Sequence, residues 1–539
     1  MRFIRMNRDY LFIGLASILW LPNIQGGYFL SDDFIHLVDW CLPPFADIWQ
    51  WFYREYAGFY RPMTALFWKL EYSVWGLNTT GYRLVNIAIH TGCALLVCKI
   101  ARSTDTSQTG LLSGIVFLFL PGHIFGVLMI SALTGLLCTL FFLASFSCYL
   151  KGRSRSFILQ TLSVFFFVLS LLTKELALSL PLLIVVCELI FQFSENSLSW
   201  AKGLRNILPH VITGCIYIGF RYLYFGHLPS SPLHETYTLS RLLINAVTYG
   251  AKIFTPWGLE RLKPFFRTHP SLLLGITIIA SACVIFLLWH KRSALTKHHA
   301  MALYWIAITL LPVVRLYSPW NTYLPGVGGA LIIASLARHD SALTFSRFNY
   351  KRFIVPSFVL ISLIYSLPHQ LHWRSARILN GEFLEQIAEV ERTYKSTFYL
   401  VNLPAEWSEA PLLVGDWALQ DALRVKGAYG RVVALSNVIK HERKENIKVS
   451  IIDSQRMLIS LESTNDFFRL DTFAALSHSA NVDVGYSYTK AGVHIEVKSV
   501  NAQGQPNSLE IDMGSTDLLS QAIVWEDNQF KTVTGRLLK

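Results

Sequence analysis

The sequence is poor in charged residues. Only 15% of its 539 residues carry a charge, whereas soluble globular proteins contain about 25%. The deficit is concentrated before residue 370, where stretches such as 111–120 and 161–172 contain no charge at all. Such stretches cannot be hydrated and must be buried in lipid or among other helices. The composition therefore excludes an ordinary soluble protein and indicates a lipid bilayer as a partner.

The sequence also lacks a cysteine framework, a tandem repeat and a low-complexity segment. The eight cysteines show no disulfide or CxxC metal-site spacing, and none lies in the tail after residue 370. The net charge of +12 comes from basic residues in short clusters between apolar runs. Membrane topology requires this distribution, whereas nucleic-acid binding requires a basic patch. We therefore predict no nucleic-acid partner.

The apolar runs predict a polytopic helical membrane protein. A membrane-spanning helix needs about 20 apolar residues, and about eleven segments are candidates. The basic N-terminus is followed by an apolar run without a small-residue cleavage site, so we expect the first helix to be retained. The candidate spans lie near 10–27, 80–101, 108–122, 125–150, 155–173, 175–193, 206–225, 270–290, 299–316, 321–338 and 350–367.

Segment 240–257 is the ambiguous one, because it contains Arg241, Lys252 and Pro256. If it does not span, nearly all basic loops fall on the side of the N-terminus, as the positive-inside rule requires. If it spans, two basic loops move outside. The rule therefore favours an odd number of crossings, a cytoplasmic N-terminus and a tail outside the cytoplasm.

The tail changes character after residue 369. Leu371–Tyr394 has apolar residues at helical spacing, and strand-like runs follow it, with a hairpin connection at 453–456. The predicted domains are a transmembrane bundle, 1–369, with a first outer loop at 28–79, and a small α+β domain outside the cytoplasm, 370–539. The predicted strands are 398–403, 431–435, 447–452, 457–461, 482–488 and 493–497.

Several polar residues interrupt the apolar pattern, and this topology places nearly all of them at the outer ends of helices. Basic residues there run against the positive-inside trend and are costly at membrane depth, which indicates anion binding. Snorkelling to headgroups or capping of carbonyls is the alternative for any single one. The residues are Asp32, Asp33, Arg61, His123, Lys174, Glu175, Arg221 and Arg315.

Asn86 and His90 are four residues apart and therefore share one face of the second predicted helix. They are candidate substrate-binding residues. The alternative, which we favour for this pair, is an interhelical hydrogen bond inside the bundle.

The order of these residues along the chain resembles the order found in a known family. The series resembles the GT-C class of membrane glycosyltransferases, and most of all the protein O-mannosyltransferase-like branch with the tetratricopeptide-carrying animal enzymes and their bacterial relatives. The resemblance covers roughly residues 10–340 and rests on order and spacing. Its segments are Asp32-Asp33, Tyr60-Arg61-Pro62, Trp75 to His90, Pro121-Gly122-His123, Leu172-Thr173-Lys174-Glu175 with Pro181, Phe220-Arg221-Tyr222 and Tyr323-Leu324-Pro325-Gly326.

The resemblance implies a polyprenyl-phosphate-linked sugar donor, used on the non-cytoplasmic face, and a glycan, lipid or protein acceptor. A phosphate leaving group needs no general acid, so one carboxylate acting as base on the acceptor hydroxyl suffices. By resemblance Asp32 or Asp33 is that base, with a slight preference for Asp33, and a single displacement inverts the anomeric carbon. Arg221, Arg315 and Lys174 are the candidates for supporting the phosphate.

Two departures from the family pattern bear on metal use. Relatives often carry an acidic residue just after the Pro-x-His motif, where this chain has Ile124-Phe125-Gly126. The Arg-plus-acid element that often follows is Ala132-Leu133-Thr134 here. No cofactor is predicted, and the need for a divalent metal is left open.

Two other functions are weighed against the glycosyltransferase. A polymerase or ligase of lipid-linked glycans usually has a large outer loop late in the chain, whereas the long outer segment here is early. A transporter or flippase predicts broken helices and an internal repeat, and the sequence shows no two-half symmetry.

Overall fold

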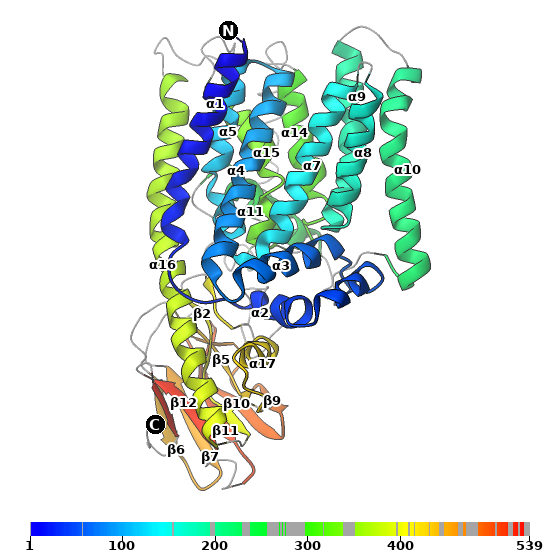
Figure 1. Cartoon of the computed structure of the whole chain (residues 1–539). Helices are drawn as coiled ribbons and strands as arrows, with labels where there is room; N and C mark the ends of the chain where they lie inside the picture. The colour runs from blue at the N-terminus through cyan, green and yellow to red at the C-terminus, as the bar shows by residue number, and fades with distance from the viewer. Residues whose placement is uncertain are drawn as a thin grey trace. The chain divides into compact units, whose positions relative to one another are not determined.

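The apolar runs that the computed structural model describes among the first 370 residues fold as helices (Figure 1). The structure describes residues 2–532 with gaps. The longer gaps are 195–199, 229–237, 256–296 (apart from 269, 272 and 275), 338–350, 441–446, 462–466, 470–482 and 516–520. The chain forms two compact units. The first comprises 1–24, 46–74 and 81–369, and the second comprises 25–45, 75–80 and 370–539.

The first unit is a bundle of helices joined by short loops and 3-10 turns. Trp68, Trp305 and Phe142 are among its fully buried side chains, and Figure 1 shows α3 lying across the direction of the long helices. The helices are α1 (Arg2–Ala16), α3 (Pro62–Trp75), α4 (Thr79–Thr104), α5 (Ser107–Leu118), α6 (Ile124–Leu128), α7 (Leu133–Gly152), α8 (Phe157–Leu171), α9 (Ser179–Ser194), α10 (Trp200–Phe225), α11 (Leu239–Phe254), α14 (Lys297–Leu310), α15 (Gly326–Leu336) and α16 (Lys351–Tyr394).

The predicted number of eleven spans is not confirmed. Among the described residues, four helices are long and apolar enough to cross a membrane, or five if the bent pair 107–118 and 121–128 counts as one span. Several predicted spans are interrupted: α1 ends at Ala16 and continues as a 3-10 turn, and a 47° bend separates α5 from the next turn. The helices α8 and α15 are shorter than a span, and 270–290 lies almost wholly outside the described residues.

The N-terminal helix and the helix ends beside two loops that are predicted to be cytoplasmic meet at one end of the bundle, which we call the basic end. Arg102, near the end of α4, pairs with Asp9 of α1. Thr104 Oγ1 lies 2.9 Å from His298 Nδ1, at the start of α14. The predicted parity brings these segments to one side, so the contacts agree with it.

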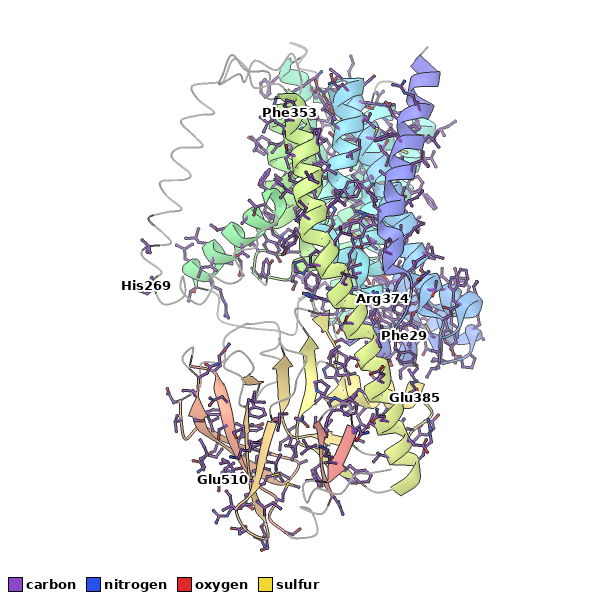
Figure 2. The ribbon with its side chains drawn as sticks, turned by 90° about the vertical axis from the view of Figure 1, so that its left-hand side faces the viewer. Phe29, His269, Phe353, Arg374, Glu385 and Glu510 are labelled. Atoms are coloured by element: carbon purple, nitrogen blue, oxygen red, sulfur yellow. The ribbon has the colours of Figure 1, made fainter. Side chains whose placement is uncertain are left out.

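Helix α11 stays at the other end of the bundle. Asn245 donates to the carbonyls of Val314 and Arg315, which follow the end of α14. A Cβ on Gly122, between α5 and α6, would lie 3.1 Å from the Lys252 carbonyl. Both halves of α11 thus contact the same end, and in Figure 2 it is inclined to the long helices. This arrangement favours the non-spanning interpretation of 240–257.

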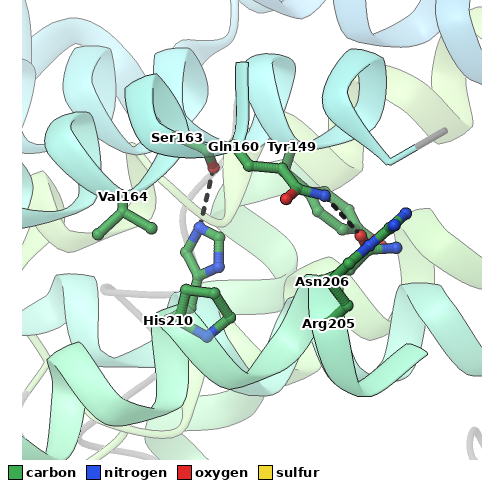
Figure 3. Close-up of a pocket in the computed structure, with 8 residues that line it drawn as sticks. Tyr149, Gln160, Ser163, Val164, Arg205, Asn206 and His210 are labelled. Carbon is green, nitrogen blue, oxygen red and sulfur yellow. Dashed lines mark hydrogen bonds between the residues drawn. The ribbon is translucent and has the colours of Figure 1, made fainter. Parts of the chain in front are cut away.

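A polar network joins α7, α8, α9 and α10. Glu188 is 1% exposed and accepts from Tyr149 Oη at 2.9 Å, Arg153 Nε at 3.1 Å and Asn206 Nδ2 at 2.9 Å. Beside it is a cavity of about 10 Å³, room for about one water. Figure 3 shows two hydrogen bonds at this cavity, Gln160 to Asn206 and Ser163 to His210. No residue of the predicted site lines it, so we assign the network to helix packing.

The second unit contains the predicted α+β tail. Its strands form three sheets, ordered β13-β12-β1-β4, β6-β7-β11-β10-β9 and β3-β2-β5-β8. The lower part of α16 packs on it through Phe383 and Trp525, whose ring centroids are 5.1 Å apart. The elements after α16 are β1 (Phe398–Leu400), β2 (Leu403–Trp407), β3 (Ala410–Pro411), α17 (Asp416–Val425), β4 (Val432–Ala434), β5 (Asn437–Lys440), β6 (Ile447–Ile451), β7 (Arg456–Leu461), β8 (Phe467–Arg469), β9 (Ser487–Lys490), β10 (Val493–Val500), β11 (Pro506–Asp512), β12 (Ala522–Glu526) and β13 (Gln529–Thr532).

The predicted hairpin at 453–456 is confirmed. Strands β6 and β7 pair antiparallel with Ile451 opposite Met457. Asp453 Oδ1 accepts the amides of Gln455 and Arg456, both at 2.9 Å. The predicted strand 482–488 is wrong in its first part, because 484–485 form a turn and β9 begins at Ser487.

Glu71 on α3 generates a prediction for the stability of the bundle. It is 6% exposed, neither carboxylate oxygen has a hydrogen-bond partner in the described part of the chain, and burial raises its pKa to about 8. When the pKa of an acid is higher in the folded state than in the unfolded state, the folded protein loses stability as the pH rises from the unfolded-state pKa through the folded-state pKa. We therefore expect Glu71→Gln to raise Tm at pH 8.5 by at least ~2 °C relative to wild type, and by less at pH 5.5.

Thermal unfolding in detergent at the two pH values measures this difference. Glu382→Gln, at an exposed position on α16, is the matched control and should behave as wild type. Equal pH dependence in Glu71→Gln and wild type would contradict the buried neutral acid.

Candidate functional site

Arg61 and Glu175 form an ion pair that joins the first loop to the start of the sixth predicted span. Arg61 Nη2 lies 2.9 Å from Glu175 Oε1. Arg61 stands immediately before α3, whose first turn is anchored by a bond from the Met63 amide to the Leu172 carbonyl, 3.1 Å. Glu175 begins the 3-10 turn η6 (Glu175–Leu178). Two predicted site residues that are far apart in the sequence are therefore brought together.

Lys174 adds a second cation next to this pair. Its ammonium donates to Asn321 Oδ1 at 3.0 Å, where Asn321 lies in the turn η9 (Pro319–Thr322). Lys174 interacts electrostatically with both Arg61 and Glu175. The sequence did not single out Asn321, although it lies two residues before the Tyr323-Leu324-Pro325-Gly326 segment.

Arg221 is the third cation and the most buried. Located on α10, it is 1% exposed. Its Nη2 donates to the Gly58 carbonyl at 3.0 Å, and Nη1 lies 3.4 Å from Glu55 Oε2. The guanidinium carbon is 5.1 Å from the ring centroid of Phe225. Among the described residues, Nε and Nη1 have no hydrogen-bond partner.

Glu55 is a residue that the sequence interpretation missed. Besides Arg221, it binds His227, whose Nε2 lies 2.7 Å from Glu55 Oε1. The Leu228 carbonyl and the Glu55 carboxylate raise the pKa of His227. In the sequence, Glu55 is marked only by its place in the aromatic-rich first loop. That place does not show which of the acids in the loop contacts Arg221.

Tyr217 connects these pairs into one group, which we call the cation cluster: Arg61, Lys174 and Arg221 with Glu175 and Glu55. Tyr217, on α10, interacts electrostatically with Glu175, Arg221 and Arg61. Two arginines and a lysine thus lie near two carboxylates. Buried N–H donors that lack acceptors are costly, and an oxyanion with several acceptor oxygens is the ligand that would satisfy them. The arrangement is suited to binding a phosphate.

The acidic pair belongs to the second unit. Asp32 and Asp33 begin the short helix α2 (Asp32–His36). Asp33 is 2% exposed and its Oδ2 accepts the Leu30 amide at 2.9 Å, whereas Asp32 is half-buried. Asp33 is therefore partly engaged in a turn, which the sequence did not reveal.

Asn86, His90 and His123 are buried inside the bundle. Asn86 Nδ2 donates to the Met129 carbonyl at 3.1 Å, and His90 Nδ1 lies 2.6 Å from the Tyr323 hydroxyl. His123 Nδ1 lies 2.9 Å from the Phe117 carbonyl. All three are at most 1% exposed. The interhelical alternative for Asn86 and His90 is thus supported, whereas His123 Nε2 has no hydrogen-bond partner among the described residues.

Arg315 differs from Arg221 in its exposure. Its side chain is exposed, and its carbonyl accepts from Asn245 at 3.1 Å. In the part of the chain that the structure describes, no group of three or more His, Cys, Asp or Glu residues could hold a metal ion.

Comparison with known proteins supports the resemblance. No family model matches the chain. The chain is 28% identical over 298 residues to the protein O-mannosyl-transferase F38B6.6 of Caenorhabditis elegans, which covers 48% of this chain and 42% of that protein. It is 26% identical over 238 residues to human TMTC4, also a protein O-mannosyl-transferase, covering 36% and 32%. The matches thus span less than half of these relatives. The resemblance to O-mannosyltransferases is confirmed.

Two solved structures align with most of this chain. ArnT from Cupriavidus metallidurans in the apo state aligns with 81% of this chain and 95% of that chain, with a TM-score of 0.44 and 13% identity. The apo oligosaccharyltransferase of Archaeoglobus fulgidus aligns with 79% of this chain and 64% of that chain, with a TM-score of 0.40 and 11% identity.

The cation cluster generates a prediction for anion binding. We expect Arg221→Ala to weaken binding of a short-chain polyprenyl phosphate by at least ~10-fold, because hydrogen bonds to charged groups contribute about 1.5–3 kcal/mol. The affinity of Arg221→Lys should fall between those of wild type and Arg221→Ala, since an ammonium keeps the charge but loses the forked donors.

Binding of the radiolabelled lipid to purified protein measures the effect. Arg205→Ala, at an exposed position on the same helix, is the matched control and should bind as wild type. Equal affinities for wild type and Arg221→Ala would reject the cluster as a phosphate site.

Proposed function

We propose that this chain is a glycosyltransferase that moves a monosaccharide from a polyprenyl-phosphate donor to an acceptor hydroxyl. The observation that carries the proposal is the buried Arg221, which lies in a cluster of three cations and two carboxylates and whose Nε has no acceptor among the described residues. A lipid phosphate completes its hydrogen bonds. The similarity to O-mannosyltransferases gives independent support for sugar transfer.

In the proposed reaction the cations stabilise the departing phosphate. As the bond from the anomeric carbon to the phosphate oxygen breaks, negative charge grows on the phosphate, and fixed cationic donors in a dry site lower the energy of that state. Arg61 and Lys174 are held by Glu175 and Asn321, so little reorganisation is needed. No general acid is required, because the phosphate leaves as an anion.

Asp32 or Asp33 is the proposed base. One carboxylate takes the proton from the acceptor hydroxyl while the oxygen attacks the anomeric carbon from the face opposite the phosphate, which inverts the configuration. Asp33 was the first choice from the sequence. Its Oδ2 accepts the Leu30 amide, and the half-buried Asp32 competes with it for the role.

The proposed setting is the inner membrane of a bacterium. We propose that the basic end faces the cytoplasm, since Arg102 and helix ends beside predicted basic loops meet there, and that the donor is used at the other end. The second unit is then outside the cytoplasm. The acceptor is a glycan, a lipid or a protein.

Replacing each aspartate by asparagine separates its proposed role as a base from its role in the turn. Asn at position 33 keeps an oxygen that accepts the Leu30 amide but cannot take a proton. We therefore expect Asp33→Asn to lower kcat by about 10²–10⁴-fold with donor binding unchanged, and Asp32→Asn to have a smaller effect. Transfer from a labelled polyprenyl-phosphate sugar to surface glycans, lipids and proteins measures the rate.

The reverse order of the two effects would assign Asp32 as the base. Full activity in both variants would reject a base in this pair. Movement of the labelled lipid across reconstituted vesicles without any sugar transfer would favour a flippase, and extension by many sugars a polymerase.

A further inference from the structure

The acidic pair follows a strained turn. The Asp33 amide donates to the Leu30 carbonyl at 2.9 Å, which closes a four-residue turn with Ser31 at its second position. Ser31 has φ +39° and ψ −110°, a combination near that of a type II′ turn, where glycine is the usual residue. In the described chain, only Ser31 and Ala491 combine a side chain with a positive φ. Strain of this kind persists only where surrounding contacts impose it.

Residues of the second unit supply those contacts. The Ser31 amide donates to the Leu412 carbonyl at 2.8 Å, and the Tyr28 amide donates to the Arg377 carbonyl at 3.0 Å. Asn380 Nδ2 donates to the Phe29 carbonyl at 2.7 Å. Figure 2 shows Phe29 beside α16, between the levels of Arg374 and Glu385. The segment that precedes the two aspartates is thus bonded at three successive points.

The chain runs so close to α16 that only glycine fits at position 27. A Cβ there would lie 2.3 Å from Arg377 Cβ and 2.8 Å from the Arg377 carbonyl carbon, and its φ is +81°. The approach brings the Phe29 carbonyl within reach of Asn380, which is 1% exposed. Of the three hydrogen bonds described above, the one from Asn380 comes from a side chain, so a single substitution removes it.

We propose that Asn380 is a positioning residue for the catalytic carboxylate: the second unit holds the strained turn at Ser31 and thereby fixes where Asp32 and Asp33 point. This role rests on the proposed function. It explains why a strained non-glycine residue directly precedes the acidic pair, and it gives the C-terminal domain a part in catalysis. A misplacement of the base by about 1 Å costs up to ~10²-fold in rate.

The test combines a variant that removes the Asn380 hydrogen bond with one that relieves the backbone strain at Ser31. Asn380→Ala removes the bond to Phe29, and we expect kcat to fall by about 10- to 100-fold while donor KM stays unchanged, because the cation cluster is built from other residues. In the variant Ser31→Gly, the backbone at position 31 can adopt a positive φ without strain. In the double variant Ser31→Gly/Asn380→Ala the turn should form without help, and most of the lost kcat should return.

Asn402→Ala is the matched control. Asn402 is also 1% exposed and also clamps a backbone, since it donates to the Trp525 carbonyl at 2.7 Å and accepts the Trp525 amide at 2.9 Å. It belongs to the same unit but has no bond to the acidic turn among these contacts. Its loss should lower Tm at least as much as Asn380→Ala, with little change in kcat of the folded enzyme.

Three results would overturn the positioning role. They are an unchanged kcat in Asn380→Ala, an equal loss of kcat in Asn402→Ala at equal Tm, and a double variant as slow as Asn380→Ala alone. An inactive wild type with every polyprenyl-phosphate sugar would instead reject the proposed function, and the positioning role with it. The wild-type assay therefore separates the two failures.

Discussion

The burial of the Arg221 guanidinium is the constraint on which the rest of the cation cluster depends. A charge this deeply buried requires partners, because an unpaired buried ion costs several kcal/mol. Glu55 and the Gly58 carbonyl provide part of what is needed. The segment around Glu55 and Gly58 must therefore return to α10, and Arg61, three residues later, is brought to Glu175 by the same path. One buried cation thus organises the first loop.

The described residues do not satisfy every N–H donor of Arg221, and this distinguishes a binding site from a structural ion pair. Glu188 offers the contrast: three donors converge on it in the described structure, and its network needs no ligand. Around Arg221 the cations outnumber the carboxylates, and Nε has no acceptor within the described chain. Both centres lie among apolar helices, so the difference comes from how far each is satisfied by the protein itself.

The apolar pattern and the positive-inside rule were enough to predict which end of the bundle carries Arg61, Lys174, Glu175 and Arg221. They could not predict which residues at that end meet, since this depends on how the helices pack around one another. Arg315 was grouped with these residues because of its place in the sequence, yet its side chain is exposed.

The continuity of α16 was also beyond the sequence pattern. Pro356 and Pro368 suggest an interruption, but both lie inside one helix of 44 residues. Tertiary contacts override the local signal there, with Trp373 and Phe383 fully buried below the second proline. The hairpin at 453–456 was predictable because a single aspartate side chain defines its turn.

The missing acid after the Pro-x-His motif has a packing explanation that bears on the chemistry. Gly126 lies against Tyr323, where a Cβ would be 3.2 Å from the ring, and its neighbours Ile124 and Val127 are buried. A carboxylate at 126 would displace Tyr323, which in turn hydrogen-bonds His90. The chain has therefore used this position for helix packing. In the proposed reaction the charge of the departing phosphate then falls to Arg221, Arg61 and Lys174, and the arginines gain in importance because each presents several N–H donors in a fixed plane.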